Sequence, residues 1–207
     1  MVVIVDYGVG HLFSLASSFR AIGEETTVTS DPELIRRAER IVLPGVGAFG
    51  DAAEKLFSSG LAEVVCERAR CGVPLLGICL GMQLLLERGF EYGEYSGLGL
   101  IAGDVRPIAD LIPEGLKIPH IGWNRLSFGK EKNPLFKYVN EGEHVYFVHS
   151  YSAQGTPSAI ATTDYGAPLV AAVGEGNILG CQFHPEKSGR VGLNILRAFC
   201  EMEASSK

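Results

Sequence analysis

The sequence is poor in the features that mark membrane-bound and nucleic-acid-binding proteins. It holds a single tryptophan and three methionines among 207 residues, and its formal net charge is −6. It has no run of lysine and arginine, which argues against nucleic acid or a membrane surface as a partner. Apolar runs such as Val2–Val5 and Val145–Val148 are far shorter than the ~20 residues that span a bilayer. We therefore expect no nucleic-acid partner and no membrane partner.

The cysteines are few and scattered. There are five of them, an odd number, and no two form a CxxC pair. A chain of this length buries roughly 70% of its unfolded surface, so it can fold without disulfides. The segment MVVIVDYG lacks the basic start and long apolar core of a secretory signal. We predict a reduced, cytoplasmic protein with one domain over residues 1–207, no metal site and no cofactor.

Strand-like and helix-like segments alternate in the first half of the chain. Val2–Asp6, Arg40–Leu43 and Val73–Ile78 are apolar, β-rich runs, and the apolar residues between Leu12 and Ile22 recur at helical spacing. This alternation indicates an α/β fold, with a mostly parallel sheet and helices on both faces. Further helices are expected over Pro32–Ala38, around Leu61–Ala69, over Gly81–Arg88 and from Ser188 onward.

The second half has a different pattern. From Leu98 to Gly180, short β-rich segments follow one another closely and are punctuated by glycine and proline. Strands are expected over Leu100–Arg106, Trp123–Phe128, His144–His149, Ala159–Thr163, Leu169–Val173 and Ile178–Phe183. We predict that this part forms an antiparallel β section joined to the parallel sheet.

A cysteine flanked by glycines follows one of the buried strands. The segment Gly77-Ile-Cys79-Leu-Gly81 has the G-x-nucleophile-x-G pattern, with cysteine in the nucleophile position. A sharp strand-to-helix turn strains the central residue and lifts its side chain out of the sheet, and side chains at the glycine positions would clash. The following helix N-terminus favours the negatively charged thiolate. Cys79 is therefore the predicted nucleophile, and a buried structural cysteine is the alternative.

A thiolate nucleophile needs a base with an orienting group. The apolar strand Ile178–Phe183 ends in His184-Pro-Glu186, so a carboxylate stands two residues after an imidazole. Residues i and i+2 of an extended segment point the same way, which would let Glu186 hold one ring nitrogen of His184. His149 also ends a strand and is the rival base, but no carboxylate follows it at that spacing. His120 is expected in a proline-rich loop.

A glycine-rich loop follows the strand Arg40–Leu43. Its sequence is Pro44-Gly-Val-Gly-Ala-Phe-Gly50, and glycines let backbone N–H groups approach a ligand closely. We expect this loop and the N–H group of Leu80 to hold the oxyanion of a thioester-forming reaction. A plain turn and a phosphate loop are the alternatives, but the loop has neither the G-K-[ST] ending nor GxGxxG spacing.

Three segments together resemble the class I glutamine amidotransferases: Gly77–Gln83, Pro44–Gly47 and Phe183–Glu186. The resemblance implies a flavodoxin-like α/β sheet, a catalytic triad of Cys79, His184 and Glu186, and release of ammonia from L-glutamine for a partner synthase. It also implies that the glutamine and the oxyanion are held by Gly45, Gly47, Leu80, Gln83, Ser150 and Tyr151.

The resemblance can be narrowed, because five segments look like the glutaminase subunits of imidazole glycerol phosphate synthases: Val5–Gly10, Pro44–Gly50, Pro119–Asn124, Phe147–Tyr151 and Phe183–Ser188. This resemblance implies a heterodimer with a (β/α)8-barrel cyclase that uses the ammonia to make imidazole glycerol phosphate in histidine biosynthesis. The residues it places at the partner interface are Val9, His11, Pro119, Trp123, Asn124, Tyr146 and Lys187.

Some alternatives stay open. His11 stands where the subfamily usually has asparagine, so local partner contacts would differ there. Trp123, the single tryptophan, could instead be a core residue. The chain could also be the glutaminase of a pyridoxal phosphate or anthranilate synthase, or a non-catalytic regulatory protein on the same fold.

Overall fold

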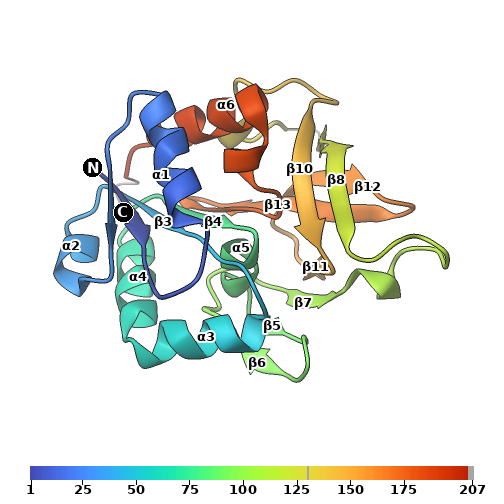
Figure 1. Cartoon of the computed structure of the whole chain (residues 1–207), viewed down its shortest axis with the longest axis horizontal. Coiled ribbons are helices and arrows are strands. Elements are labelled where there is room, and N and C mark those ends of the chain that lie inside the picture. The colour runs from blue at the N-terminus through green and yellow to red at the C-terminus, as the bar shows by residue number, and fades with distance from the viewer. Residues whose placement is uncertain (130, 205–207) are drawn as a thin grey trace.

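The computed structural model describes residues 1–129 and 131–204, and its centre is an eight-stranded sheet (Figure 1). The strand order is β2-β1-β3-β4-β14-β13-β12-β9. Strands β2, β1, β3, β4 and β14 run parallel, and β13, β12 and β9 continue the sheet antiparallel. The bounds are β1 (Val2–Val5), β2 (Thr26–Thr29), β3 (Arg40–Leu43), β4 (Leu75–Ile78), β9 (Ser127–Phe128), β12 (Ala159–Asp164), β13 (Pro168–Glu175) and β14 (Ile178–Cys181). The predicted α/β class with an antiparallel section is confirmed.

Helices cover both faces of this sheet. Figure 1 shows α1 (Leu12–Ala21) and α6 (Gly189–Cys200) above it, and α3 (Phe49–Ser58) and α4 (Leu61–Arg70) below it. Apart from the edge strand β2, the parallel strands are buried on both faces of the sheet, because successive side chains point to opposite faces and helices cover both. In β1, Val2 and Ile4 belong to the core under α1 and α6, whereas Val3 and Val5 belong to the core against α3 and α4. The short helix α2 (Pro32–Arg36) contributes Ile35 to the second core.

Two smaller sheets flank the antiparallel end. One is the ribbon of β8 (His120–Arg125) and β10 (His144–His149), whose register pairs His120 with His149 and Trp123 with Tyr146. The other has the order β11-β7-β5-β6, with bounds β11 (Tyr151–Gln154), β7 (Asp104–Pro107), β5 (Arg88–Gly89) and β6 (Tyr95–Ser96). Among the described residues, no helix has the length and apolar character that a bilayer crossing requires.

Several local expectations differ from the structure. The strand expected over Leu100–Arg106 begins only at Asp104, and the one expected over Trp123–Phe128 is divided between β8 and β9. The helix expected over Gly81–Arg88 is shorter, since α5 covers only Leu80–Leu84 and Arg88 pairs with Asp104 in β7. Pairing with a distant segment ends the helix there, because the carbonyl groups at the end of α5 accept hydrogen bonds from N–H groups of the segment after β6. Helix α3 begins inside the glycine-rich segment, where only a loop was expected. His120 does not lie in a loop, but begins β8 and is buried.

Candidate active site

The turn after β4 holds Cys79 in a strained backbone conformation. Its φ and ψ angles are 54° and −113°, in the left-handed half of conformational space that non-glycine residues rarely enter. The flanking glycines are sterically required. A Cβ atom added to Gly81 would lie 1.9 Å from the Leu43 carbonyl oxygen, and one added to Gly77 would lie 2.7 Å from the backbone of Met82. The expected clash is therefore present on both sides of the cysteine.

Strand β14 holds the cysteine from the other side. The Cys79 N–H group donates to the Cys181 carbonyl oxygen at 2.7 Å, and Gln182 Nε2 lies 3.9 Å from Cys79 Sγ. The fully buried Gln182 also accepts a 3.0 Å hydrogen bond at Oε1 from Gln83 Nε2. Sequence reasoning missed Gln182, although an amide inside an apolar strand two residues before His184 was a usable signal.

His184 and Glu186 lie together at the end of β14. Nδ1 of His184 is 2.7 Å from Oε1 of Glu186, and both side chains are only 3% exposed. The expected pairing is present, but its geometry differs from the extended segment assumed. Glu186 lies in a 3-10 turn (Pro185–Lys187), and this turn brings the carboxylate under the ring. The second carboxylate oxygen, Oε2, is buried without a hydrogen-bond partner among the described residues.

The surroundings of His184 favour its protonated form. Burial disfavours a charged imidazolium, but hydrogen bonds to Cys79 and Glu186 outweigh that effect and raise the pKa of His184 to about 9. At neutral pH the ring therefore carries two protons, one facing Glu186 and one available on the side of the sulfur. This arrangement suits a cysteine nucleophile with an imidazolium proton donor.

The backbone of His184 is held by a buried hydroxyl group. Ser188 Oγ donates to the His184 carbonyl oxygen at 2.6 Å and accepts the Tyr146 N–H group at 3.0 Å. The His184 N–H group in turn donates to the Tyr146 carbonyl oxygen at 3.0 Å. Ser188 does precede α6 as expected, but its hydroxyl group makes no capping bond. It joins the His184 turn to strand β10 instead.

The glycine-rich loop lies directly against the nucleophile turn. A Cβ atom on Gly45 would come within 2.7 Å of the Gly81 nitrogen and 2.9 Å of the Leu80 Cβ atom. Tyr7 holds this loop, because its hydroxyl group donates to the Pro44 carbonyl oxygen at 2.7 Å. Burial, with the nearby Cys79, raises the pKa of Tyr7, so the hydroxyl group keeps its proton. Leu80 opens α5, where N–H groups have no partner within the helix.

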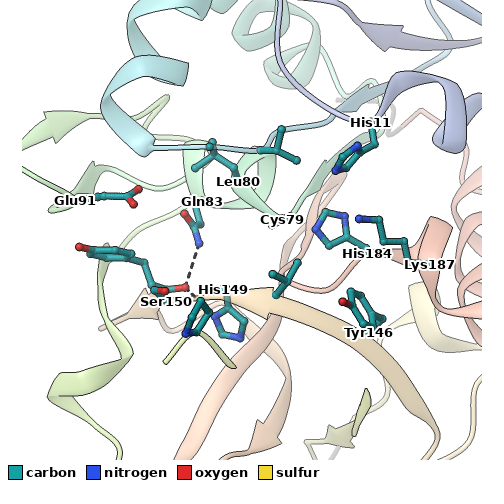
Figure 2. Close-up of a pocket in the computed structure, with 15 residues that line it drawn as sticks. His11, Cys79, Leu80, Gln83, Glu91, Tyr146, His149, Ser150, His184 and Lys187 are labelled. Carbon is teal, nitrogen blue, oxygen red and sulfur yellow. Dashed lines mark hydrogen bonds between the residues drawn. The ribbon is translucent and has the colours of Figure 1, made fainter. Parts of the chain in front are cut away.

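A pocket of about 400 Å³ opens over Cys79. Figure 2 shows Gln83, Glu91 and Ser150 on one side of Cys79, and His184, His11 and Lys187 on the other. The structure brings most of the expected substrate residues into this pocket: Gly47, Leu80, Gln83, Ser150 and Tyr151. Gly45 and Glu186 do not line the pocket; Gly45 lies behind it against Leu80, and Glu186 behind His184.

Glu91 lines the pocket and was missed in the sequence. Its Oε2 atom accepts the N–H group of Phe49 at 2.8 Å, so the N-terminus of α3 fixes the carboxylate. Nothing in the sequence around Glu91 marks it, since its role depends on where α3 begins. A carboxylate at this end of the pocket suits an ammonium group. No cluster of three or more His, Cys, Asp or Glu side chains in residues 1–129 and 131–204 could hold a metal ion.

The rival base His149 cannot serve the sulfur. Its Nδ1 atom donates to the Tyr151 carbonyl oxygen at 2.9 Å, and its Nε2 atom faces Nδ1 of His120 at 3.0 Å. Burial lowers the pKa of His149 to about 4, and the nearby His120 and His184 act in the same direction. His149 is therefore neutral at physiological pH, and both of its ring nitrogens have partners other than Cys79.

Several residues expected at a partner interface surround the mouth of the pocket. Trp123 is 55% exposed, so it is not a core residue, and its ring packs edge-on against Tyr146 at a centroid distance of 6.2 Å. The His11 ring lies edge-on to His184, also at 6.2 Å between centroids. Val9 is half-buried against the core. The remaining three are placed as follows: Pro119 and Lys187 line the pocket, and Asn124 is half-buried on β8.

The fold and the site together define a class of protein. A cysteine at a strained strand-to-helix turn, with a histidine–glutamate pair after the neighbouring parallel strand, is the arrangement expected of a cysteine-dependent amidotransferase. The model of the family described as "Glutamine amidotransferase class-I" matches residues 3–202, and this chain belongs to that family. Solved structures agree on the fold: a glutamine amidotransferase crystal structure has a TM-score of 0.75 at 20% identity and covers 97% of this chain and 98% of its own.

Curated relatives narrow the class. Subunit HisH of imidazole glycerol phosphate synthase from Lactococcus lactis subsp. lactis (strain IL1403) is 48% identical over 202 residues, covering 97% of this chain and 98% of the relative. The protein of the same name from Wolinella succinogenes is 46% identical over 205 residues, covering 98% of this chain and 100% of the relative. Within the class I family, this chain therefore falls among the HisH subunits.

Proposed function

We propose that this chain hydrolyses L-glutamine to glutamate and ammonia through a thioester on Cys79. We further propose that it delivers the ammonia to a cyclase subunit that makes imidazole glycerol phosphate in histidine biosynthesis. One observation supports the proposed chemistry most directly. The strained Cys79 and the His184–Glu186 pair follow the adjacent parallel strands β4 and β14, and Cys79 and His184 line one pocket. The assignment to histidine biosynthesis is supported by the names of two relatives, which are 48% and 46% identical to this chain over nearly its full length.

The first half of the reaction would acylate the sulfur. The Cys79 thiolate attacks the side-chain carboxamide carbon of glutamine, and the carbonyl oxygen becomes an oxyanion. The N–H group of Leu80 and the Gly45–Gly47 loop, packed against it, would stabilise that oxyanion. His184 then gives its sulfur-side proton to the departing nitrogen. The C–N bond breaks, ammonia leaves, and His184 is neutral.

The second half would release glutamate. A water molecule attacks the thioester carbon while neutral His184 takes one of its protons. The C–S bond then breaks, which returns the thiolate and leaves the imidazolium as it began, and the product carboxyl group releases its remaining proton to solvent as glutamate. Glu186, 2.7 Å from Nδ1, keeps the ring oriented and stabilises its positive charge in both halves.

The far end of the pocket would bind the amino-acid part of glutamine. Glu91 offers a carboxylate to the α-ammonium group, and Gln83 and the Ser150–Tyr151 segment also line this end of the pocket (Figure 2). Gln83 is already oriented by Tyr151 and Gln182, so little side-chain freedom would be lost on binding. The fixed distance between this end and Cys79 would select a substrate with the reach of glutamine.

The outer face of the β8–β10 ribbon suits a protein partner. Ile121 and Trp123 are 58% and 55% exposed, and they form an apolar patch with Tyr146 beside the pocket mouth. We propose that a (β/α)8-barrel cyclase docks here as the second subunit of a heterodimer. In this proposal residues 1–207 act as one amidotransferase domain, in the reducing cytoplasm that would keep all five cysteines as free thiols.

The test uses the complex of this chain with its cyclase subunit. Cys79→Ala should abolish glutamine-dependent synthesis and leave ammonia-dependent synthesis unchanged, because free ammonia bypasses the thioester. Cys71→Ala, at an exposed cysteine that does not line the pocket, is the matched control and should retain both activities. An equal loss of both activities in Cys79→Ala would show that Cys79 is structural.

A second experiment tests the partner. The chain, used as bait with purified synthases, should bind the cyclase subunit of imidazole glycerol phosphate synthase. Binding to an anthranilate or pyridoxal phosphate synthase instead would overturn the assignment of the pathway and leave the glutaminase chemistry standing.

A further inference from the structure

Two buried histidines lie beside the pocket and have no part in the chemistry proposed above: His149 lines the pocket, and His120 lies behind His149. His120 and His149 are 2% and 6% exposed, and they face each other across the β8–β10 ribbon. Nδ1 of His120 lies 3.0 Å from Nε2 of His149. Burying two titratable rings against each other is costly unless each nitrogen has a suitable partner. The hydrogen-bond partners of these ring nitrogens therefore indicate what the two histidines do.

The outer end of the pair is fixed by Asn124. The side-chain Nδ2 atom of Asn124 donates to the Asp164 carbonyl oxygen at 2.8 Å, and its Oδ1 atom accepts the Arg125 N–H group at 2.8 Å. A carbonyl group only accepts and an N–H group only donates, so these two backbone groups set the orientation of the amide. The Nδ2 atom also lies 3.3 Å from Nε2 of His120, which must then accept.

The inner end is fixed by Tyr151. Nδ1 of His149 is 2.9 Å from the Tyr151 carbonyl oxygen, and so it must carry the proton. If His149 is neutral, its Nε2 atom is an acceptor, and His120 donates to it from Nδ1. One arrangement of protons satisfies every contact, with both rings neutral and protonated at Nδ1. The hydrogen bonds then run in one direction, from Asn124 through His120 and His149 to Tyr151.

Packing holds the rings in this arrangement. The His120 ring is stacked between Tyr165 and Phe147, at centroid distances of 4.2 Å and 4.9 Å. The Tyr165 hydroxyl group is itself held by the Lys117 carbonyl oxygen at 2.8 Å. The rings therefore cannot easily turn to exchange partners.

The carbonyl group at the inner end is part of the glutamine wall. The Tyr151 oxygen accepts a second hydrogen bond, at 3.1 Å, from Nε2 of Gln83, which Figure 2 shows as a dashed line beside Ser150 and above His149. The neighbouring Ser150 carbonyl oxygen accepts the Ile108 N–H group at 2.9 Å. The His149 bond thus helps to set both the direction of the Tyr151 carbonyl group and the position of Gln83.

We propose that His120 and His149 are positioning residues, a neutral relay that orients Tyr151 and Gln83 for glutamine and ties them to the strand that carries Trp123. The relay starts at Asn124, the residue after Trp123 on β8, and ends in the pocket. A shift of β8 on docking would therefore reach the Tyr151 carbonyl group through three side chains, those of Asn124, His120 and His149. The kinetic part of this inference rests on the proposed glutaminase function, whereas the proton arrangement does not.

The proton arrangement is tested on the isolated chain. Imidazole ¹⁵N spectra at pH 7 should show His120 and His149 as neutral rings protonated at Nδ1, the tautomer that free histidine disfavours. Single His120→Gln and His149→Gln variants assign the signals. Nε2-protonated rings, or a charged ring at pH 7, would overturn the relay whether or not the chain is a glutaminase.

The positioning role is tested by two substitutions in the complex. His149→Asn places its amide near the Nδ1 position and can keep the bond to Tyr151, whereas His149→Gln places its amide near Nε2 and cannot. We expect His149→Gln to raise KM for glutamine about tenfold, the effect of one lost hydrogen bond, with kcat within about twofold. His149→Asn should raise KM by less, and neither variant should change ammonia-dependent synthesis.

His144→Asn is the matched control, an exposed histidine at the start of the same strand, and it should behave as the wild type. Equal KM values for His149→Gln and wild type would overturn the inference, and so would equal losses of glutamine-dependent and ammonia-dependent synthesis. An inactive wild-type complex would instead refute the proposed function, and the ¹⁵N spectra would still decide the relay.

Discussion

The nucleophile turn and the β8–β10 ribbon build the same pocket by different means. Around Cys79, position is set by hard contacts: a methyl group added at Gly81, Gly77 or Gly45 would overlap backbone atoms at 1.9–2.7 Å. In the ribbon, position is set by a row of hydrogen bonds that runs from the Asn124 side chain through two histidine rings to the Tyr151 carbonyl group. The packing around Cys79 leaves no space for an added side-chain atom, whereas the hydrogen bonds of the ribbon can change when a proton or a strand moves.

This difference suits what each region has to do. The sulfur must stand at one place relative to the attacked carbon and the oxyanion donors, because small errors there are costly in rate. The ribbon has an outer face with Trp123 exposed and an inner face with His149 buried. The hydrogen bonds run along the inner face from Asn124, the chain neighbour of Trp123, so a movement of β8 caused by a partner on the outer face would reach His149. The predictions below test that contrast.

The largest effect is expected at Gly81. Its substitution by alanine forces a Cβ atom to within 1.9 Å of the Leu43 carbonyl oxygen, so the start of α5 and the end of β3 must move apart. We expect Gly81→Ala to lower the free energy of unfolding by more than ~4 kcal/mol or to prevent folding. Gly129→Ala is the control, since nothing lies within 4 Å of an added Cβ atom there. Urea unfolding measures both, and equal stabilities would show that the turn is not sterically fixed.

The second-largest effect is expected at His149 in the β8–β10 ribbon, in the pH dependence of the free energy of unfolding. His149 has an ordinary pKa of 6.5 and a pKa of about 4 in the fold, so the unfolded chain binds its proton first. The stability that this neutral ring contributes is present above pH 6.5 and is lost as the pH falls toward 4, by about 3 kcal/mol in all. His149→Asn removes this part of the acid dependence. Urea unfolding at pH 7 and pH 4.5 compares the two proteins, and identical acid losses would contradict the prediction.

A smaller effect is expected at Glu186, on the side of the nucleophile. Glu186→Gln keeps the shape of the side chain but removes the charge that helps to raise the pKa of His184 to about 9. The pKa of His184 should fall, and kcat for glutamine should drop roughly 10–100-fold. The stability that comes from the protonated ring is present below pH 6.5 and lost as the pH rises toward 9, so the variant should lose it at lower pH.

The pH dependence of Cys79 alkylation and of urea unfolding measures that shift. Glu63→Gln, an exposed carboxylate on α4, is the control. An unchanged pH profile in Glu186→Gln would mean that the carboxylate does not act on His184.

The smallest effect on the isolated chain is expected at Trp123. Its side chain is 55% exposed, so Trp123→Ala should change the free energy of unfolding by less than ~1 kcal/mol. Binding of the cyclase subunit should nevertheless weaken about 10–100-fold, as for a central aromatic anchor. Phe57→Ala, at a 46% exposed aromatic residue on α3, is the control. Calorimetric titration compares them, and equal affinities would place the interface elsewhere.

Sequence patterns located the residues whose signal is local. Cys79 between two glycines and His184 before Pro185-Glu186 were visible because each pattern reflects a turn made by neighbouring residues. Strand β10 (His144–His149) was predicted with its observed bounds, since buried and more exposed residues alternate along it. Ser188 was expected at the start of the last helix, but only the structure shows its hydroxyl group bonded to His184 and Tyr146.

Residues whose signal is not local were missed. Glu91 depends on the position of the α3 N-terminus, 42 residues earlier in the chain, and Gln182 depends on its contacts with Cys79 and Gln83. His120 was expected in a loop because Pro119 precedes it, but pairing with His149 made the segment a strand. No spacing rule relates such positions, because the contacts form only when distant segments pack.

The sequence by itself determined the class of chemistry: a cysteine in a glycine-bounded turn, a histidine–glutamate pair and the family they indicate. Those features are set by backbone sterics and by neighbours within a few residues, and these operate wherever the turn is. Only the tertiary structure decided the partners of the two rival histidines. His149 ends β10 and His184 follows β14, but His184 packs against a carboxylate and a thiol, and His149 against a carbonyl group and a second ring. Burial with these different partners moves their pKa values in opposite directions.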